Sequence, residues 1–169
     1  DSMGGYDGTI VDLNVTGSTK AWTPGKFGSG LMFGPEYGRI ETGSVPFDGS
    51  FTLSVWLNPS DINDSSSVIM AKDGFNQMNV FKLRKQNANG HVVLDFYTDG
   101  NSTATSLQSG SPVLSNNEWI HLAVVYNDAN GTLRIFADGN LSNELSSLSL
   151  SGFPLNQRFS PFKIGGSLN

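Results

Sequence analysis

The chain has 169 residues, and its fifteen Asp and Glu against ten Lys and Arg give a formal net charge of −5 at pH 7. This length fits one domain over residues 1–169, and an acidic balance without a basic face argues against nucleic acid as a partner. The lack of cysteine excludes disulfides and Cys-ligated metals, and no apolar run approaches the ~20 residues that cross a bilayer.

The composition predicts an all-β protein. Twenty Gly and seven Pro, with many Ser, Thr and Asn, separate short apolar runs, and strong helix formers never keep a helical spacing for long. Short strands at this spacing, without helices between them, indicate two packed antiparallel sheets.

The chain begins with a Gly-rich loop, residues 1–8, that carries the carboxylates of Asp1 and Asp7. Carboxylates and backbone carbonyls in a tight loop are the oxygen ligands that Ca²⁺ prefers. An ordinary surface turn is the simpler alternative for the same residues.

Turns rich in Gly, Asn, Asp and Pro divide the rest of the chain into short strands. The expected strands are Thr9–Val15, Leu31–Phe33, Tyr37–Glu41, Phe51–Leu57, Val68–Ala71, Val80–Lys85, His91–Thr98, Thr103–Leu107, Trp119–Tyr126, Thr132–Ala137, Leu141–Leu150 and Phe162–Gly166. The segment Thr19–Gly30 is too punctuated for a long strand, and we expect a loop that carries Trp22 and Phe27.

The segment Phe51–Leu57 alternates most cleanly between apolar and polar residues. One face carries Phe51, Leu53, Val55 and Leu57, and the other carries Thr52, Ser54 and Trp56. A Trp on an otherwise polar face can have one of two roles: it packs against a second layer of structure, or it lines a groove on the outer surface. Packing is the simpler of the two roles.

Residues 118–139 predict a long antiparallel hairpin, because two β-branched and aromatic runs flank an Asn-Asp-Ala-Asn-Gly turn. We expect Trp119 and Phe136 to lie in the core. His121 has no Ser or Cys nucleophile beside it in the sequence, and a structural hydrogen bond is its expected role. His91, which follows a turn, is expected to be exposed.

Seven segments, in order, carry a resemblance to a known family. They are Asp-Ser-x-Gly-Gly-x-Asp-Gly-Thr-Ile from Asp1, Gly-x-Phe-Gly-x-Gly-Leu-x-Phe from Gly25, Phe-Thr-Leu-Ser-Val-Trp-Leu-x-Pro from Phe51, Ile-Met-Ala-Lys from Ile69, Trp-Ile-His-Leu-Ala-Val-Val-Tyr from Trp119, Gly-Thr-Leu-Arg-Ile-Phe-Ala-Asp-Gly from Gly131 and Phe-Lys-Ile-Gly-Gly from Phe162. Together they resemble a laminin G-like domain of the concanavalin A-like lectin/glucanase superfamily, related to pentraxins, over almost the whole chain. The cysteine pair of pentraxins is absent here.

The resemblance implies a two-sheet antiparallel β-sandwich, or jelly roll, without the family's usual first and last strands. Either the parent polypeptide was trimmed, or a neighbouring segment or subunit supplies these strands by β-augmentation. The resemblance also implies a calcium ion at the rim of the sandwich, near Asp1 and Asp7.

No catalytic residues are expected. Laminarinase-type relatives place two or three carboxylates at alternate positions of one strand, and no such run occurs here. Sugar binding needs an aromatic platform with amide or carboxylate partners beside it. The candidates are Trp22, Tyr37, Trp56 and Tyr97, although core or edge packing explains each of them equally well.

Five Asn-x-Ser/Thr sequons lie in or beside expected turns, at Asn14, Asn63, Asn101, Asn130 and Asn140. About three would arise by chance in a chain this rich in Asn, Ser and Thr. They therefore support a glycoprotein only weakly.

The sequence as a whole predicts a noncatalytic recognition or adhesion module of an extracellular or cell-surface protein, with a glycan or a cell-surface protein as its partner. The alternative is a structural subunit of a surface assembly, a filament or an adhesin stalk. In that case a neighbour, such as a second copy in a homo-oligomer, would donate the missing strands.

Overall fold

A computed structural model describes residues 5, 7–11, 22–33, 38–43, 45, 49–63, 67–73, 79–86, 89–97, 104–148 and 161–166. The strands in these ranges are β1 (Thr9–Val11), β2 (Trp22–Pro24), β3 (Ser29–Leu31), β4 (Arg39–Glu41), β5 (Phe51–Leu57), β6 (Val68–Asp73), β7 (Asn79–Lys85), β8 (Val92–Tyr97), β9 (Ala104–Gln108), β10 (Ile120–Asn127), β11 (Thr132–Ala137), β12 (Asn140–Leu145) and β13 (Phe162–Gly165). In that part of the chain no helix has the length and apolar character needed to cross a membrane.

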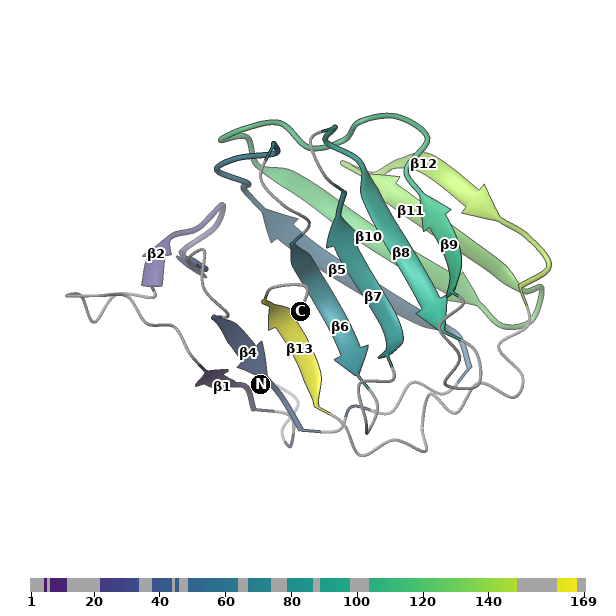
Figure 1. Cartoon of the computed structure of the whole chain (residues 1–169), viewed down its shortest axis with the longest axis horizontal. Helices are drawn as coiled ribbons and strands as arrows, with labels where there is room; N and C mark the ends of the chain where they lie inside the picture. Colours follow the sequence, from purple (N-terminus) through teal and green to yellow (C-terminus); the bar gives the residue numbers. More distant parts are fainter. Residues whose placement is uncertain are drawn as a thin grey trace.

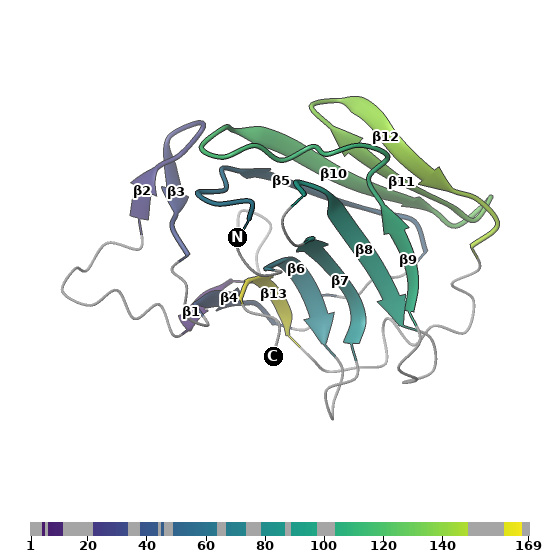
Figure 2. The ribbon, with the colours of Figure 1, turned by 45° about the horizontal axis from the view of Figure 1, so that its top comes forward.

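The strands form a two-layer antiparallel sandwich, as the sequence predicts. The seven-stranded sheet has the order β1-β4-β13-β6-β7-β8-β9, and the four-stranded sheet has the order β12-β11-β10-β5. Figure 1 shows the seven-stranded sheet in front and the four-stranded sheet behind it. The strands β2 and β3 form a separate hairpin at one end of the sandwich (Figure 2).

One apolar residue from every strand of the seven-stranded sheet lies in a single cross-strand row. In order across the sheet these residues are Ile10, Ile40, Ile164, Met70, Leu83, Leu94 and Leu107. Because side chains of a strand alternate between faces, this row fixes which face of each strand meets the core.

The four-stranded sheet supplies the other half of the core. In β10 the buried residues are Ile120, Leu122, Val124 and Tyr126, at every second position. The apolar face of β5 packs against the same core cluster, as its alternation predicts.

Aromatic rings join the two sheets in the interior. The ring of Phe51 on β5 lies 6.4 Å from that of Phe81 on β7 and 5.6 Å from that of Tyr126 on β10. Phe81 also lies 6.1 Å from Phe162 and 6.2 Å from Phe96, measured between ring centroids. Phe81 is fully buried and is therefore central to this contact between the layers.

Two lysines point into the sandwich at opposite ends of the β6–β7 ladder. Lys72 is fully buried, and its ammonium donates to the carbonyl oxygen of Val45. Lys85 is almost fully buried, and its Nζ lies 3.1 Å from the carbonyl oxygen of Ile62. Because a buried charge is costly unless hydrogen-bonded, these carbonyl contacts are needed to hold each lysine in place.

The structure corrects several expectations from the sequence. Phe136 is half-buried and lies on the outer face of its sheet opposite Ala123, because Leu133 and Ile135 take the inward positions of β11. Trp119 precedes β10 and is half-buried outside the core cluster. The third correction concerns Thr19–Gly30, whose described part is the β2–β3 hairpin rather than a loop.

Replacing Phe81 by Ala should lower the free energy of unfolding by about 3–5 kcal/mol, because the change removes a buried ring and leaves a cavity between the sheets. Equilibrium unfolding in urea measures this loss. The exposed Thr52 on β5 provides a control, and Thr52→Ala should change the free energy of unfolding by less than about 0.5 kcal/mol. Equal losses for the two variants would contradict the interior position of Phe81.

Candidate functional site

The candidate site is an exposed aromatic surface at the end of β5. Trp56 lies on the outer face of the four-stranded sheet, directly opposite His121 of β10, and is 39% exposed. Its position follows from the alternation of β5, which turns Phe51, Leu53, Val55 and Leu57 toward the core. A large aromatic side chain is therefore held on the solvent side by a strand whose other face is fixed.

The turn of the β2–β3 hairpin lies against Trp56. Phe27 meets the Trp56 ring edge to face, with 5.7 Å between centroids, and Lys26 Nζ lies 5.3 Å from the Trp56 centroid, as in a cation–π contact. Phe27 is itself 75% exposed. The hairpin and β5 together present two neighbouring aromatic rings and one ammonium group to solvent.

His121 and Asp138 complete this surface. The His121 ring lies 5.1 Å from the Trp56 ring between centroids. Asp138 Oδ1 accepts a hydrogen bond of 2.9 Å from the backbone N–H of His121, and the Asp138 N–H donates to the His121 carbonyl at 2.9 Å. Asp138 and Gly139 both have positive φ, which suits the tight turn between β11 and β12. The turn therefore places a carboxylate beside the histidine.

Of the four aromatic residues proposed from the sequence, the structure describes the side chains of Trp56 and Trp22. Trp56 is in the site, whereas Trp22 lies on β2 and is 60% exposed. Tyr97 is on β8, where its backbone pairs with Ala104, and its side chain is outside the description. Tyr37 lies outside the described residues.

The residues that complete the Trp56 surface could not be recognised from strand patterns. Lys26 and Phe27 lie in a turn, and His121 was expected to serve as a scaffold residue. The only local signal was the sequence Gly-Lys-Phe-Gly, in which an apolar side chain stands between turn-forming glycines.

The proposed calcium ligands are only partly visible. Asp7 is exposed ahead of β1, and Asp1 lies outside the described residues. No group of three His, Asp or Glu side chains within the described ranges is placed to hold a metal ion. Calcium binding therefore stays a prediction, and we derive no binding step through a metal.

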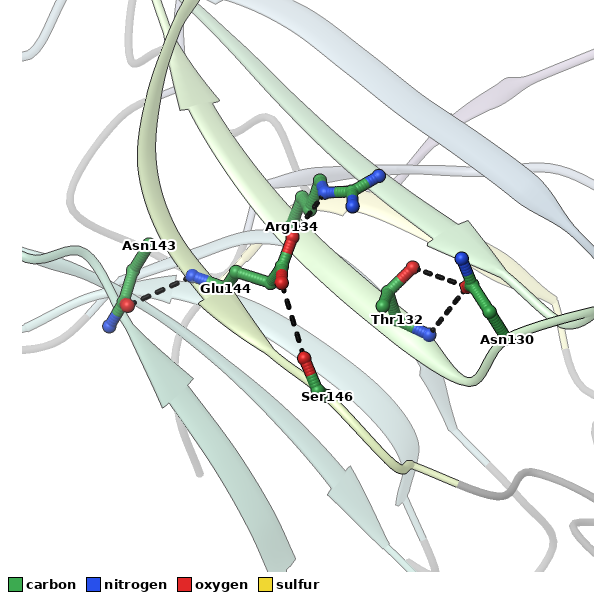
Figure 3. A network of polar contacts seen from close by, with 6 residues as sticks. All are labelled: Asn130, Thr132, Arg134, Asn143, Glu144 and Ser146. Atoms are coloured by element: carbon green, nitrogen blue, oxygen red, sulfur yellow. Dashed lines mark hydrogen bonds and ion pairs between the residues drawn. The ribbon is translucent and has the colours of Figure 1, made fainter.

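Three of the five sequon asparagines, Asn63, Asn130 and Asn140, are exposed, and Asn14 and Asn101 lie outside the described residues. Asn130 makes an Asx-type turn with its own sequon (Figure 3). Its Oδ1 accepts 2.6 Å and 3.2 Å hydrogen bonds from the hydroxyl and the N–H of Thr132. The side chain of Asn130 is exposed, which is compatible with glycosylation of its amide nitrogen. Glycosylation at this position stays a prediction.

A polar network lies beyond this turn on the outer face of the four-stranded sheet. Arg134 Nε donates to Glu144 Oε2, and Ser146 Oγ donates to Glu144 Oε1 at 3.1 Å (Figure 3). The hydrogen bond from Arg134 and then that from Ser146 lower the pKa of Glu144 below its ordinary value of 4.5. The network ties β11 to β12, since Arg134 and Glu144 are directly opposite each other.

This pKa shift makes a prediction about acid stability. Because the folded-state pKa of Glu144 is lowered, its contribution is present above the unfolded-state pKa and is lost as the pH falls through the folded-state pKa. Wild type should therefore be more stable than Glu144→Gln at pH 7, and the difference should vanish in acid. Urea unfolding across this pH range measures it.

The matched control uses the partner of the carboxylate. In an Arg134→Gln background, Glu144→Gln should have a smaller pH-dependent effect, because the main cause of the lowered pKa is gone. An undiminished effect in that background would show that another group controls Glu144.

Comparisons with known proteins agree with this architecture. The family model described as "Concanavalin A-like lectin/glucanases superfamily" matches residues 34–169. A Rattus norvegicus protein named "Sushi, von Willebrand factor type A, EGF and pentraxin domain-containing protein 1" is 29% identical over 109 residues. This alignment covers 64% of the present chain and 3% of the rat protein, so the chain spans a small fraction of that relative.

Solved structures share the fold at low identity. The CBM40 of the IT-sialidase from Ruminococcus gnavus, bound to α2,3-sialyllactose, has a TM-score of 0.57 and 14% identity, over 72% of this chain and 65% of that one. An endo-1,3-β-glucanase from Streptomyces sioyaensis has a TM-score of 0.55 and 11% identity, over 78% and 58%. At such low sequence identity, the structural similarity shows a common fold alone. The function must therefore be argued from the residues of this chain.

Proposed function

The chain belongs to the concanavalin A-like lectin/glucanases superfamily, and we propose that it is a noncatalytic carbohydrate-binding module of an extracellular or cell-surface protein. The observation that carries this proposal is the exposed aromatic pair of Trp56 and Phe27 beside Lys26, His121 and Asp138. The apolar face of a sugar ring packs on aromatic rings, while its hydroxyls need donors and acceptors at the edge. The surface around Trp56 offers both kinds of group.

The noncatalytic part of the proposal rests on the carboxylates. Glycoside hydrolysis needs two carboxyl groups facing one another at a set separation across the scissile bond. Of the described carboxylates, Glu41, Asp95 and Glu144 are each engaged by an arginine, and Asp138 is engaged by the β10 backbone. Because an endo-glucanase has the same fold, the competing class is an enzyme. Release of reducing ends from polysaccharides by the purified chain would reject the noncatalytic assignment.

A glycan array of neutral oligosaccharides, followed by calorimetry on the best ligand, tests the Trp56 surface. Trp56→Ala should lower the affinity about tenfold or more, because a lost stacking contact of ~1.4 kcal/mol corresponds to a factor of ten. Leu141→Ala is the control, since Leu141 is also exposed and lies on the same sheet but three strands from β5. Equal affinities of Trp56→Ala and wild type would rule out this surface.

Calcium binding and glycosylation are two further parts of the proposal, each with its own measurement. Calcium-dependent binding, assigned from the sequence to Asp1 and Asp7, is assayed by repeating the measurement with a chelator. Glycosylation at Asn14, Asn63, Asn101, Asn130 and Asn140 is assayed by the intact mass of the protein isolated from its natural source. Treatment with a glycan-removing enzyme should lower the mass of a glycoprotein and leave the mass of an unmodified protein unchanged.

A structural role is the second candidate, and one observation favours it. β5 is the outermost strand of the four-stranded sheet, and none of the described residues pairs with its outer edge. Phe51–Leu57 contains neither charge nor proline, the features that usually protect an edge from pairing. A strand donated by a neighbouring subunit would add to this edge. A strictly monomeric chain at all concentrations in sedimentation experiments would argue against this role.

A further inference from the structure

Lys26 is a cation of the candidate surface whose charge no described residue neutralises. It is exposed, and its ammonium makes neither an ion pair nor a hydrogen bond within the described part of the chain. Its contact is with the face of the Trp56 ring, 5.3 Å from Nζ to the ring centroid. The other described cations are engaged by neighbouring groups, and they are Arg39, Lys72, Lys82, Arg84, Lys85, Arg134 and Lys163.

The carboxylate of this surface lies away from Lys26. Asp138 Oδ1 accepts the backbone N–H of His121 at 2.9 Å, and the Asp138 N–H donates to the His121 carbonyl. Because β10 pairs with β5 along its other edge, Trp56 and Asp138 lie on opposite sides of His121. The surface therefore has an ammonium group at its β5 end and a carboxylate beyond β10.

The backbone at Lys26 is held close to Trp56. Phe27 packs on the Trp56 ring, and the Gly25 N–H donates to the Gly28 carbonyl at 2.9 Å across the turn. The side chain of Lys26, in contrast, is a flexible four-carbon stem. The ammonium can thus leave the ring while the turn stays in place.

A sugar ring that stacks on this face of Trp56 must displace the ammonium. Stacked rings are in van der Waals contact, about 3.5–4.0 Å between carbon atoms, and Nζ stands in the same space above the ring. A neutral sugar would break the cation–π contact without replacing its electrostatic part. A sugar with a carboxylate at the ring edge would give the displaced ammonium an ion pair. Displacement of Lys26 therefore favours the acidic sugar.

We propose that the Trp56 surface prefers acidic sugars of the uronic acid type, whose carboxylate pairs with Lys26 while the sugar ring packs on Trp56. The hydroxyls on the far side of the sugar then face His121 and Asp138, whose carboxylate accepts hydrogen bonds. The inference rests on the proposed function, because it names the class of carbohydrate for the same surface. Lys26 sets the preference, and Trp56 supplies affinity for acidic and neutral sugars alike.

Calorimetry on matched pairs of oligosaccharides tests this preference. The acidic probes are oligomers of galacturonate, glucuronate and mannuronate, and each has a neutral partner in which the carboxylate is reduced to the primary alcohol. Wild type should bind at least one acidic probe about fivefold more tightly than its neutral partner at low ionic strength, and added salt should shrink the difference. Lys26→Gln should abolish the preference and leave the affinity for the neutral partner within about twofold.

Lys82→Gln is the control, because it removes the same charge from the opposite sheet and should retain the preference. Matching unfolding midpoints confirm that the variants are folded. Trp56→Ala should weaken both members of a pair alike.

Equal affinities within every pair, or a preference that survives Lys26→Gln, would overturn the inference and leave a neutral-sugar site intact. Failure of every probe to bind would also overturn it. The array of neutral glycans then decides separately whether the Trp56 surface binds carbohydrate at all.

Discussion

The register of the seven-stranded sheet is the constraint on which the rest of the structure depends. With Ile164, Met70 and Leu83 opposite one another, the adjacent row of Lys163, Ala71 and Lys82 must face outward. A slip of one residue in β7 would turn Lys82 inward and Leu83 to solvent, which would bury a charge and expose an apolar side chain. The apolar core and the charged outer face are therefore two results of one alignment.

The same alternation operates in the four-stranded sheet and positions Trp56. Leu53, Val55 and Leu57 hold the inner side of β5 against the core, so the β5 backbone cannot rotate to bury the tryptophan. A recognition surface on a regular strand is more rigid than one on a loop, and less entropy is lost when a ligand binds. The β2–β3 turn adds side chains to that surface without altering the sheet.

Much of the fold could be predicted from the sequence, because apolar residues that recur at every second position of a strand are easily recognised. The alternation of Phe51–Leu57 is confirmed, and the ends of β10 and β8 each differ by one residue from the expected strands. The strand expected at Leu141–Leu150 is shorter, since β12 ends at Leu145. Phe136 is a position where the alternation of apolar and polar residues does not determine which side chain faces the core. In Leu-Arg-Ile-Phe-Ala the apolar run offers two frames, and only the partner residues of β10 decide which side chain faces inward.

The candidate site was harder to predict, since its residues meet through pairing across the sheet. Trp56 and His121 are far apart in the chain and become neighbours only through the register of β5 and β10. The burial of His91 was also hard to predict, because it depends on a contact with a residue that is distant in the sequence. It is half-buried rather than exposed, because its Nδ1 lies 2.9 Å from the carbonyl oxygen of Ser109.

The reactivity of the two inward-facing lysines can be used to measure how often the interior of the sandwich opens to solvent. An amine reacts with an acylating reagent only when solvent reaches it, and Lys72 and Lys85 are shielded at opposite ends of the β6–β7 ladder. Lys26, in contrast, is exposed and should be labelled at once. The labelling rates of Lys72 and Lys85 would therefore record how often each end of the interior opens, and whether the two ends open together.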